Sequence, residues 1–274
     1  MKYLGFTIVI LIAAILLIPL VWMILGSFQT SVGLQRIPPT LITNDMNFDN
    51  YKELFKYPAW LWLRNSIVVS LCSVMLTIPI NVMAGYAFAK KRFKGKEILF
   101  TMFLFTMVIP GQITLIPSFQ LMRFFGLYNS LLAMWLPSGV SVFMLFFFRQ
   151  FLSSIPNDYL DIATIDGCGE IRKFTNIIIP LSVPAIVTMA LIGFIGQWGN
   201  FLWQFIIVSR EKLYTLPVGT VQFLMQLTAF DDVAKPHYGE SFAAATFAFL
   251  PILVVFLCFQ KYYTNGLFTG SIKG

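Results

Sequence analysis

Six long uncharged stretches constrain this chain more than any other feature of its sequence. Read between flanking charged residues, they run over 3–35, 65–89, 98–122, 124–148, 174–209 and 241–260. A helix needs about 20 mainly apolar residues to cross a bilayer, and each stretch can hold one such helix. Only 11% of the residues are charged, compared with about 25% in soluble domains. We therefore predict an all-α membrane protein with six transmembrane helices.

A seventh uncharged stretch, residues 213–230, is shorter and more polar than the other six. It contains Pro217, Gly219 and several glutamines and threonines, whose transfer into hydrocarbon is unfavourable. We expect it to lie outside the bilayer or at its surface. The first stretch follows Lys2 and has no small-residue cleavage site at its end, so we expect a retained helix rather than a signal peptide.

The positive charges predict how the six helices are oriented. With six crossings, both termini and the connectors after the second and fourth stretches lie on one side, which carries most of the basic residues and the cluster KKRFKGK at 90–96. Short basic loops stay in the cytoplasm. We therefore expect a single transmembrane domain, 1–274, with cytoplasmic N- and C-termini. A cytoplasmic connector is expected at about 149–180, and extracytoplasmic loops at about 29–63 and 209–240.

The expected spans contain no Asp, Glu, Lys, Arg or His. Proton-driven carriers use such groups as relays inside the membrane, so either another source drives transport or the protein is a passive pore. The chain also lacks a phosphate-binding loop, because Gly95 and Lys96 are followed by Glu97, and it has a single histidine, His237. We expect no catalytic site, no metal site and no cofactor.

Two polar stripes lie on the expected helices. In the second stretch, small and polar residues recur every three or four positions and therefore share one face. These residues are Ser66, Ser70, Ser73, Thr77, Asn81 and Gly85. Such a face allows close packing of helices, and contact with a transported substrate is the alternative.

The fifth stretch carries amides on one face, with indole rings close by. The candidate pathway residues are Gln197, Trp198, Asn200, Trp203 and Gln204. Amides bond to hydroxyl groups and flat aromatic rings cover the faces of pyranose sugars, so these residues could line a sugar pathway. Amides also form hydrogen bonds between helices in membranes. Both interpretations, pathway lining and interhelical bonding, are open at this point.

The connector DIATIDGCGEIRKF, residues 161–174, gathers carboxylates, a glycine break and a basic pair between two apolar stretches. Pro156 suits the first turn of a helix, and Asp161 complements the positive end of the helix dipole. Gly167 is placed to end this helix, and a second amphipathic segment, 170–179, follows it. A helix, a glycine turn and a second helix would form a compact knob that fits a groove on a partner. A solvated loop is the alternative.

The run LDIATIDGCGEIRKFTNIIIPLSVP, residues 160–184, resembles the EAA signature of permease subunits in ABC importers. That signature reads approximately E-A-A-x-x-D-G-A, followed by a spacer, an apolar run and P-L-x-x-P. The corresponding positions here are Asp161, Ile162 and Ala163 at E-A-A, Asp166 and Gly167 at D-G, Cys168 at the next alanine, and Pro180, Leu181 and Pro184 at the close. The first two positions and Cys168 depart from the pattern, whereas the Asp-Gly pair and the spacing are kept.

The resemblance extends over nearly the whole chain. Segments similar to the MalG-like, maltose-type branch of carbohydrate importer permeases are NSIVVSLCS (65–73), AGYAFAKKRFKGK (84–96), MVIPGQITLIPSF (107–119), GLYNS (126–130), YTLPVG (214–219) and QKYYTNGLFTGSIKG (260–274). The chain is thus identified as resembling the inner-membrane permeases of binding-protein-dependent sugar importers.

This resemblance implies a multi-pass protein of a bacterial or archaeal cytoplasmic (inner) membrane, in contact with membrane lipid. It implies that the chain forms half of a pathway for a sugar or oligosaccharide. The implied partners are a second related permease subunit, two cytoplasmic ATPase subunits that hydrolyse ATP, and an extracytoplasmic sugar-binding protein, with no nucleic acid. The alternative is a stand-alone membrane channel or carrier for a polar solute, and a scaffold without a pathway is a third hypothesis.

The resemblance also implies roles for particular residues. Coupling to the ATPase subunits is assigned to the connector residues Asp161, Ile162, Ala163, Asp166, Gly167, Cys168 and Arg172. Contact with the binding protein is assigned to the loop before the last span, where Lys235, His237 and Tyr238 are the candidates.

Overall fold

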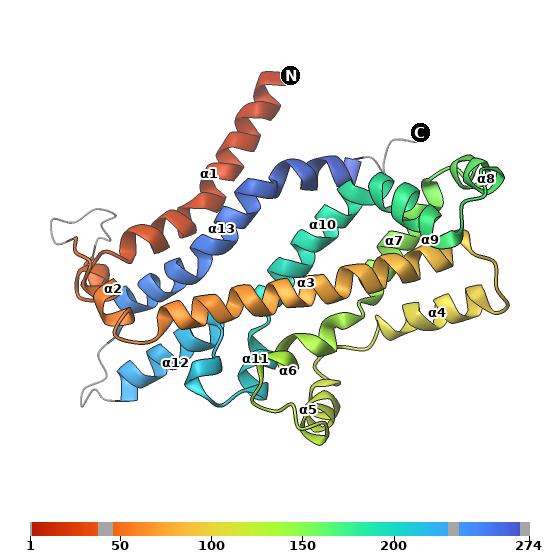
Figure 1. The fold of residues 1–274 in the computed structure, drawn as a ribbon. Coiled ribbons are helices and arrows are strands. Elements are labelled where there is room, and N and C mark those ends of the chain that lie inside the picture. The colour runs from red at the N-terminus through yellow and green to blue at the C-terminus, as the bar shows by residue number, and fades with distance from the viewer. Residues whose placement is uncertain (1, 38–45, 230–235, 269–274) are drawn as a thin grey trace. The chain divides into compact units, whose positions relative to one another are not determined.

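The computed structural model describes residues 2–37, 46–229 and 236–268. All regular secondary structure in these ranges is helical. The chain forms two compact units, which we describe one at a time. The first comprises residues 1–64 and 214–254, and the second comprises 65–213 and 255–274. Figure 1 shows the helices along the chain.

Four helices are long. They are α1 (Lys2–Gly26), α3 (Ala59–Lys90), α10 (Ile179–Trp198) and α13 (Tyr238–Phe268). The shorter ones are α2 (Asp49–Leu54), α4 (Lys96–Thr106), α5 (Leu115–Phe124), α6 (Leu131–Trp135), α7 (Val142–Ser154), α8 (Asp158–Ile165), α9 (Glu170–Lys173), α11 (Phe201–Ile207) and α12 (Leu216–Ala229). Short 3₁₀ turns are η1 (Gly33–Gln35), η2 (Leu136–Gly139) and η4 (Glu211–Leu213), and η3 (Phe174–Ile178) is a π-helix.

Four segments of the described chain are long and apolar enough to cross a membrane: Gly5–Gly26, Ala59–Lys90, Glu170–Trp198 and Tyr238–Gln260. A fifth crossing is possible if Leu131–Gly139 and Val142–Ser154, which meet at a bend of 44°, act as one broken span. These segments fall in five of the six predicted stretches, and the all-α membrane architecture is confirmed.

The predicted third span, 98–122, is not one helix. Helix α4 ends at Thr106 and α5 begins at Leu115, with successive turns between them. Pro110 and Gly111 lie in this break. Proline has no N–H to donate and disfavours helical geometry in the residue before it, which explains why the apolar run does not continue as a helix.

The fifth predicted stretch, 174–209, is also interrupted. The chain is helical from Glu170 through η3 to the end of α10, and Gly199 and Asn200 then separate α10 from α11. The seventh stretch forms α12, which has 14 residues. At 1.5 Å per residue such a helix is about 21 Å long, shorter than the hydrocarbon core of about 30 Å.

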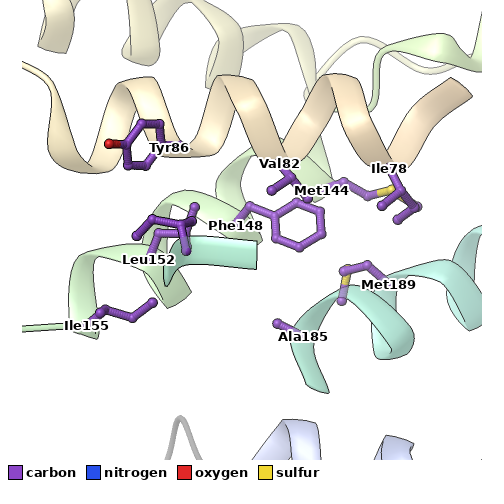
Figure 2. Packing of buried hydrophobic residues seen from close by; sticks show 10 residues of the cluster. Ile78, Val82, Tyr86, Met144, Phe148, Leu152, Ile155, Ala185 and Met189 are labelled. Carbon is purple, nitrogen blue, oxygen red and sulfur yellow. The ribbon is translucent and has the colours of Figure 1, made fainter. Parts of the chain in front are cut away.

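The core of the second unit forms where α3, α7 and α10 meet. Figure 2 shows Phe148 of α7 beside Val82 of α3, with Ala185 of α10 on its other side. Phe148 is fully buried. Gly85 permits this packing, because a Cβ atom there would stand 2.6 Å from Phe148 Cβ.

The polar stripe of α3 lies inside this unit and bonds to the bend before α7. Ser73 Oγ lies 2.8 Å from Ser138 Oγ, and Thr77 Oγ1 donates to the Ser138 carbonyl at 3.0 Å. Asn81 Oδ1 accepts a bond from the Ser141 backbone N–H at 3.2 Å. For these residues the structure therefore favours helix packing, the first of the two predicted roles.

In the first unit, polar contacts tie the end of α1 to α2 and to the start of α13. The Asn50 side-chain amide donates to the carbonyls of Ser27 and Gln29, both at 2.8 Å. Ser31 Oγ donates to Glu240 Oε2 at 2.9 Å. The segment expected as an extracytoplasmic loop, 29–63, thus contains a helix and an anchored turn, and α3 already begins within it.

Candidate functional site

The connector folds into a helix, a glycine turn and a second helix, as predicted. Helix α8 ends at Ile165 and Gly167 adopts a φ of +73°, in the left-handed region that glycine tolerates. The Gly167 N–H donates to the Thr164 carbonyl at 3.0 Å and the Cys168 N–H donates to Ala163 at 2.8 Å. These two bonds close a Schellman motif, which satisfies the last carbonyls of the helix. We call residues 158–173 the connector knob.

The connector knob presents most of its predicted coupling residues on the outside. Ala163 is buried, whereas Cys168 is half-buried. The exposed residues are Asp161, Ile162, Asp166, Gly167 and Arg172. Large apolar side chains are exposed as well, with Ile165 at 85% and Ile171 at 81%. The connector is therefore an ordered knob and not a solvated polar loop. Its exposed apolar side chains are suited to packing against the surface of a partner.

The connector knob is held to the end of α3 by an ion-pair cluster centred on Glu170. Its carboxylate pairs with Lys91, accepts a bond from Lys173 Nζ at 3.2 Å, and accepts a bond from the Tyr86 hydroxyl at 3.3 Å. Figure 1 shows α8 and α9 beside this end of α3. Lys90 Nζ donates to Asn157 Oδ1 at 2.9 Å and adds a second attachment.

Sequence reasoning missed this attachment. The cluster at 90–96 indicated only membrane orientation, because nothing in the sequence shows that Lys91 and Glu170 meet. Burial lowers the pKa of Lys91, but hydrogen bonds to Glu170 and Tyr86 and the attraction of both groups outweigh it. The pKa of Lys91 is therefore raised above its ordinary value, and the pair is charged at neutral pH.

The predicted pathway residues come together around the break between α10 and α11. Gln197 Nε2 donates to the Met134 carbonyl at 3.0 Å, and Trp203 Nε1 donates to the Ala133 carbonyl at 3.0 Å. Gln204 Nε2 donates back across the break to the Gln197 carbonyl at 2.8 Å. Trp198 is buried, and its indole N–H has no hydrogen-bond partner within the described residues. Interhelical bonding thus accounts for Gln197 and Trp203.

A polar cavity of about 220 Å³ opens beside this break. It is lined by Thr114, Leu115, Ser118, Met134, Pro137, Ser138, Asn200 and Trp203. No charged side chain is among these lining residues. The Asn200 side chain makes no hydrogen bond to any described residue, so its amide is available to a molecule in the cavity. Hydroxyl groups, one amide and one indole ring form a surface that suits a neutral polyol better than an ion.

The candidates for binding-protein contact are only partly placed. Lys235 lies outside the described residues. Tyr238 begins α13 and is 50% exposed, and His237 Nδ1 lies 3.3 Å from Glu240 Oε1. Tyr238 is thus the more accessible of the two placed residues.

Residues 78–268, which include the connector knob and the polar cavity, match the family model described as "Binding-protein-dependent transport system inner membrane component". The chain belongs to this family. As an inner-membrane component of a binding-protein-dependent transport system, it is a multi-pass transport subunit and not an enzyme, and the family resemblance found in its sequence is confirmed.

Relatives of this inner-membrane component match over almost the full chain. The arabinooligosaccharides transport system permease protein AraQ of Halalkalibacterium halodurans is 35% identical, covering 96% of this chain and 93% of the relative. The galactooligosaccharides transport system permease protein GanQ of Bacillus subtilis is 33% identical, covering 96% and 92%. A crystal structure of a bacterial ABC transporter involved in the import of the acidic polysaccharide alginate matches with a TM-score of 0.80 at 20% identity, over 96% of this chain and 97% of that chain. The last match confirms the importer-permease fold.

Proposed function

We propose that this chain is one permease subunit of an ATP-driven importer and forms half of the pathway for a neutral sugar or oligosaccharide. The observation that carries the substrate class is the uncharged polar cavity beside Asn200 and Trp203. Relatives whose names specify arabino- and galactooligosaccharides support the same class. A second related permease supplies the other half of the pathway, and an extracytoplasmic binding protein delivers the sugar.

The connector knob receives the mechanical signal of ATP hydrolysis in this proposal. Two cytoplasmic ATPase subunits hydrolyse ATP, and one of them takes the exposed tips of the knob into a cleft. The proposed coupling residues are Asp161, Ile162, Ala163, Asp166, Gly167, Cys168 and Arg172. The exposed apolar side chains and the self-contained turn support this role. EAA-like spacing from Asp161 to Pro184 adds further support.

The proposed pathway residues fall into two groups. Asn200 and Trp203 line the cavity and contact the sugar, whereas Gln197, Trp198 and Gln204 support the break that shapes it. Residues Lys235, His237 and Tyr238 contact the binding protein from the extracytoplasmic side. In the proposed topology both termini and the connector knob are cytoplasmic, and the segments 29–63 and 209–240 are extracytoplasmic.

Purification of the tagged chain from its native membrane, followed by reconstitution into vesicles, tests the proposal. We expect a second permease, an ATPase and a binding protein to co-purify, and sugar uptake to require both ATP and the binding protein. Uptake of a polar solute by the chain alone, without ATP, would instead establish the stand-alone channel or carrier.

A further inference from the structure

A second cavity, of about 370 Å³, lies between the end of α3 and the connector knob. Its lining residues are Tyr86, Lys90, Lys91, Arg92, Asn157, Leu160, Asp161, Thr164 and Lys173. Four of these side chains are cationic, and Asp161 is the one carboxylate among them. The positive-inside rule accounts for basic residues at the ends of these helices, but it does not require four of them to line one cavity.

The positive charge of this basic cavity is only partly neutralised by the protein. Glu170 pairs with both Lys91 and Lys173. Lys90 Nζ donates to the uncharged Ile155 carbonyl and Asn157 amide oxygen, so it has no carboxylate partner among the described residues. Even counting Asp161 and Glu170 against the four cations, the cavity is net positive.

Arg92 is the cation best placed to bind a ligand. It is exposed and makes no hydrogen bond or ion pair with the part of the chain that the structure describes. A guanidinium group binds phosphate oxygens through paired N–H groups in a fixed plane. The volume of the cavity is several times the share of one water molecule, about 30 Å³, so it has room for a phosphate group with bound water.

The place of the basic cavity in the chain indicates where such a phosphate would come from. Lys90 is the last residue of the apolar helix α3, and Lys173 directly precedes the apolar run that continues into α10. Both cations therefore stand where a spanning segment leaves the hydrocarbon, which is the depth of lipid headgroups. Basic pockets between helix ends on the cytoplasmic side are suited to anionic headgroups.

We propose that this basic cavity binds the phosphate group of an anionic phospholipid, with Arg92 and Lys90 as its main ligands. The lipid then lies between the end of α3 and the connector knob. This inference rests on the proposed cytoplasmic placement of the connector knob. Lipid binding can be measured without transport, so failure of the inference and failure of the proposed function give different results.

The test is native mass spectrometry of the full chain and of its purified complex in neutral detergent, titrated with phosphatidylglycerol or phosphatidylcholine. We expect retained phosphatidylglycerol and little phosphatidylcholine. Arg92→Gln should weaken phosphatidylglycerol binding about fivefold, the effect of one basic residue near an anionic membrane surface. Lys94→Gln is the matched control, because Lys94 belongs to the same basic run but does not line the cavity. This variant should bind phosphatidylglycerol as tightly as the unmodified chain does.

Three outcomes would overturn the proposal. Equal losses in Arg92→Gln and Lys94→Gln would indicate diffuse attraction to the basic run rather than a site. Binding of inorganic phosphate that depends on Arg92, without retention of phosphatidylglycerol, would identify a soluble phosphate as the ligand. Retention by the isolated chain that disappears in the complex would mean that an acidic surface of a protein partner fills the cavity.

Discussion

At the scale of single residues, two glycines fix geometry that no other residue supplies. Gly167 turns the chain with a positive φ between α8 and α9, where a Cβ atom would have free space but a strained backbone. Gly85 is restricted by space instead. Its backbone conformation is ordinary, but a Cβ atom there would clash with Phe148. The first glycine shapes the connector knob and the second allows α3 and α7 to touch.

Gly167→Val should uncouple ATP hydrolysis from sugar uptake. A left-handed conformation costs a residue with a side chain about 1–2 kcal/mol, and a β-branched one more, so the Schellman motif should open and the knob should lose its shape. The measurement is uptake per ATP hydrolysed in vesicles that hold the whole importer. Gly169→Ala is the control, since Gly169 has a φ of −68° and open space around it. Normal coupling in Gly167→Val would refute the assigned role of the turn.

Gly85→Ala should destabilise the second unit. The added methyl group would press on Phe148 Cβ and on the Arg149 backbone nitrogen, and overpacking of this kind costs about 1–3 kcal/mol. Thermal melting in detergent measures the effect as a lower melting temperature. Gly196→Ala offers a matched comparison within α10, where nothing lies within 4 Å of the added atom. Equal melting temperatures for the two variants would contradict the packing account.

Asn200→Leu should raise the KM for sugar uptake several-fold while leaving the melting temperature unchanged. Asn200 lines the polar cavity and bonds to no described side chain, so its loss removes a substrate contact but no structural one. Gln197→Leu should behave differently, because the Met134 carbonyl would lose its buried donor, at a cost of about 1–3 kcal/mol. An unchanged KM in Asn200→Leu would remove this residue from the pathway.

At the scale of elements, sequence patterns predicted where helices occur better than where they break. The hydrophobic stretches located the long helices, and Gly167 marked the end of α8 correctly. The interruption at Pro110 was missed although Pro110 and Gly111 mark it locally. The break at Asn200 was missed because an uncharged run shows no boundary when its polar groups are satisfied by distant neighbours. Trp203, for example, bonds to a carbonyl 70 residues away.

The attachment of the connector knob shows the same limit. Lys91 and Glu170 are 79 residues apart, and each reads in the sequence as an ordinary surface charge. Only the packing of α7 and α10 against α3 brings them together. The two cavities could not be predicted from the sequence for the same reason, because residues from several helices line each of them.

Charge reversal tests whether the ion-pair cluster transmits motion. Glu170→Lys should reduce uptake because it places a third cation beside Lys91 and Lys173, and the double variant Lys91→Glu, Glu170→Lys should restore part of it. No recovery in the double variant would show that the residues act independently. Since the pKa of Lys91 is raised, the positive charge of Lys91 is fully present below the ordinary lysine value of 10.5 and is lost only as pH rises through the raised value. Uptake should therefore show no loss from this pair between about pH 6 and pH 9.

At the scale of the whole molecule, the proposed orientation in the membrane rests on charge rather than on packing. The basic run at 90–96 and the basic residues of the connector knob both lie at the ends of apolar helices. The positive-inside rule places such ends in the cytoplasm. Composition and periodicity were sufficient for the membrane class, whereas the number of crossings depends on how α4 and α5 sit in the bilayer.

Reporter fusions measure this orientation directly. A reporter that is active only in the cytoplasm should be active when fused after residue 274 and when inserted after residue 94, and inactive when inserted after residue 56. An extracytoplasmic reading at the C-terminus would contradict an even number of crossings. If the reporter inserted after residue 94 is inactive, and so lies outside the cytoplasm, the predicted orientation of the helices in the membrane is reversed.

The self-closing turn at Gly167 has a consequence for the docking that we propose between the connector knob and an ATPase subunit. Because the turn satisfies the last carbonyls of α8 within the chain itself, its conformational entropy is lost when the chain folds and not in the proposed docking. Docking can then occur between preorganised surfaces, with no segment that must fold on contact. Such a joint can separate and re-form in every transport cycle without the delay or the aggregation risk of repeated local refolding.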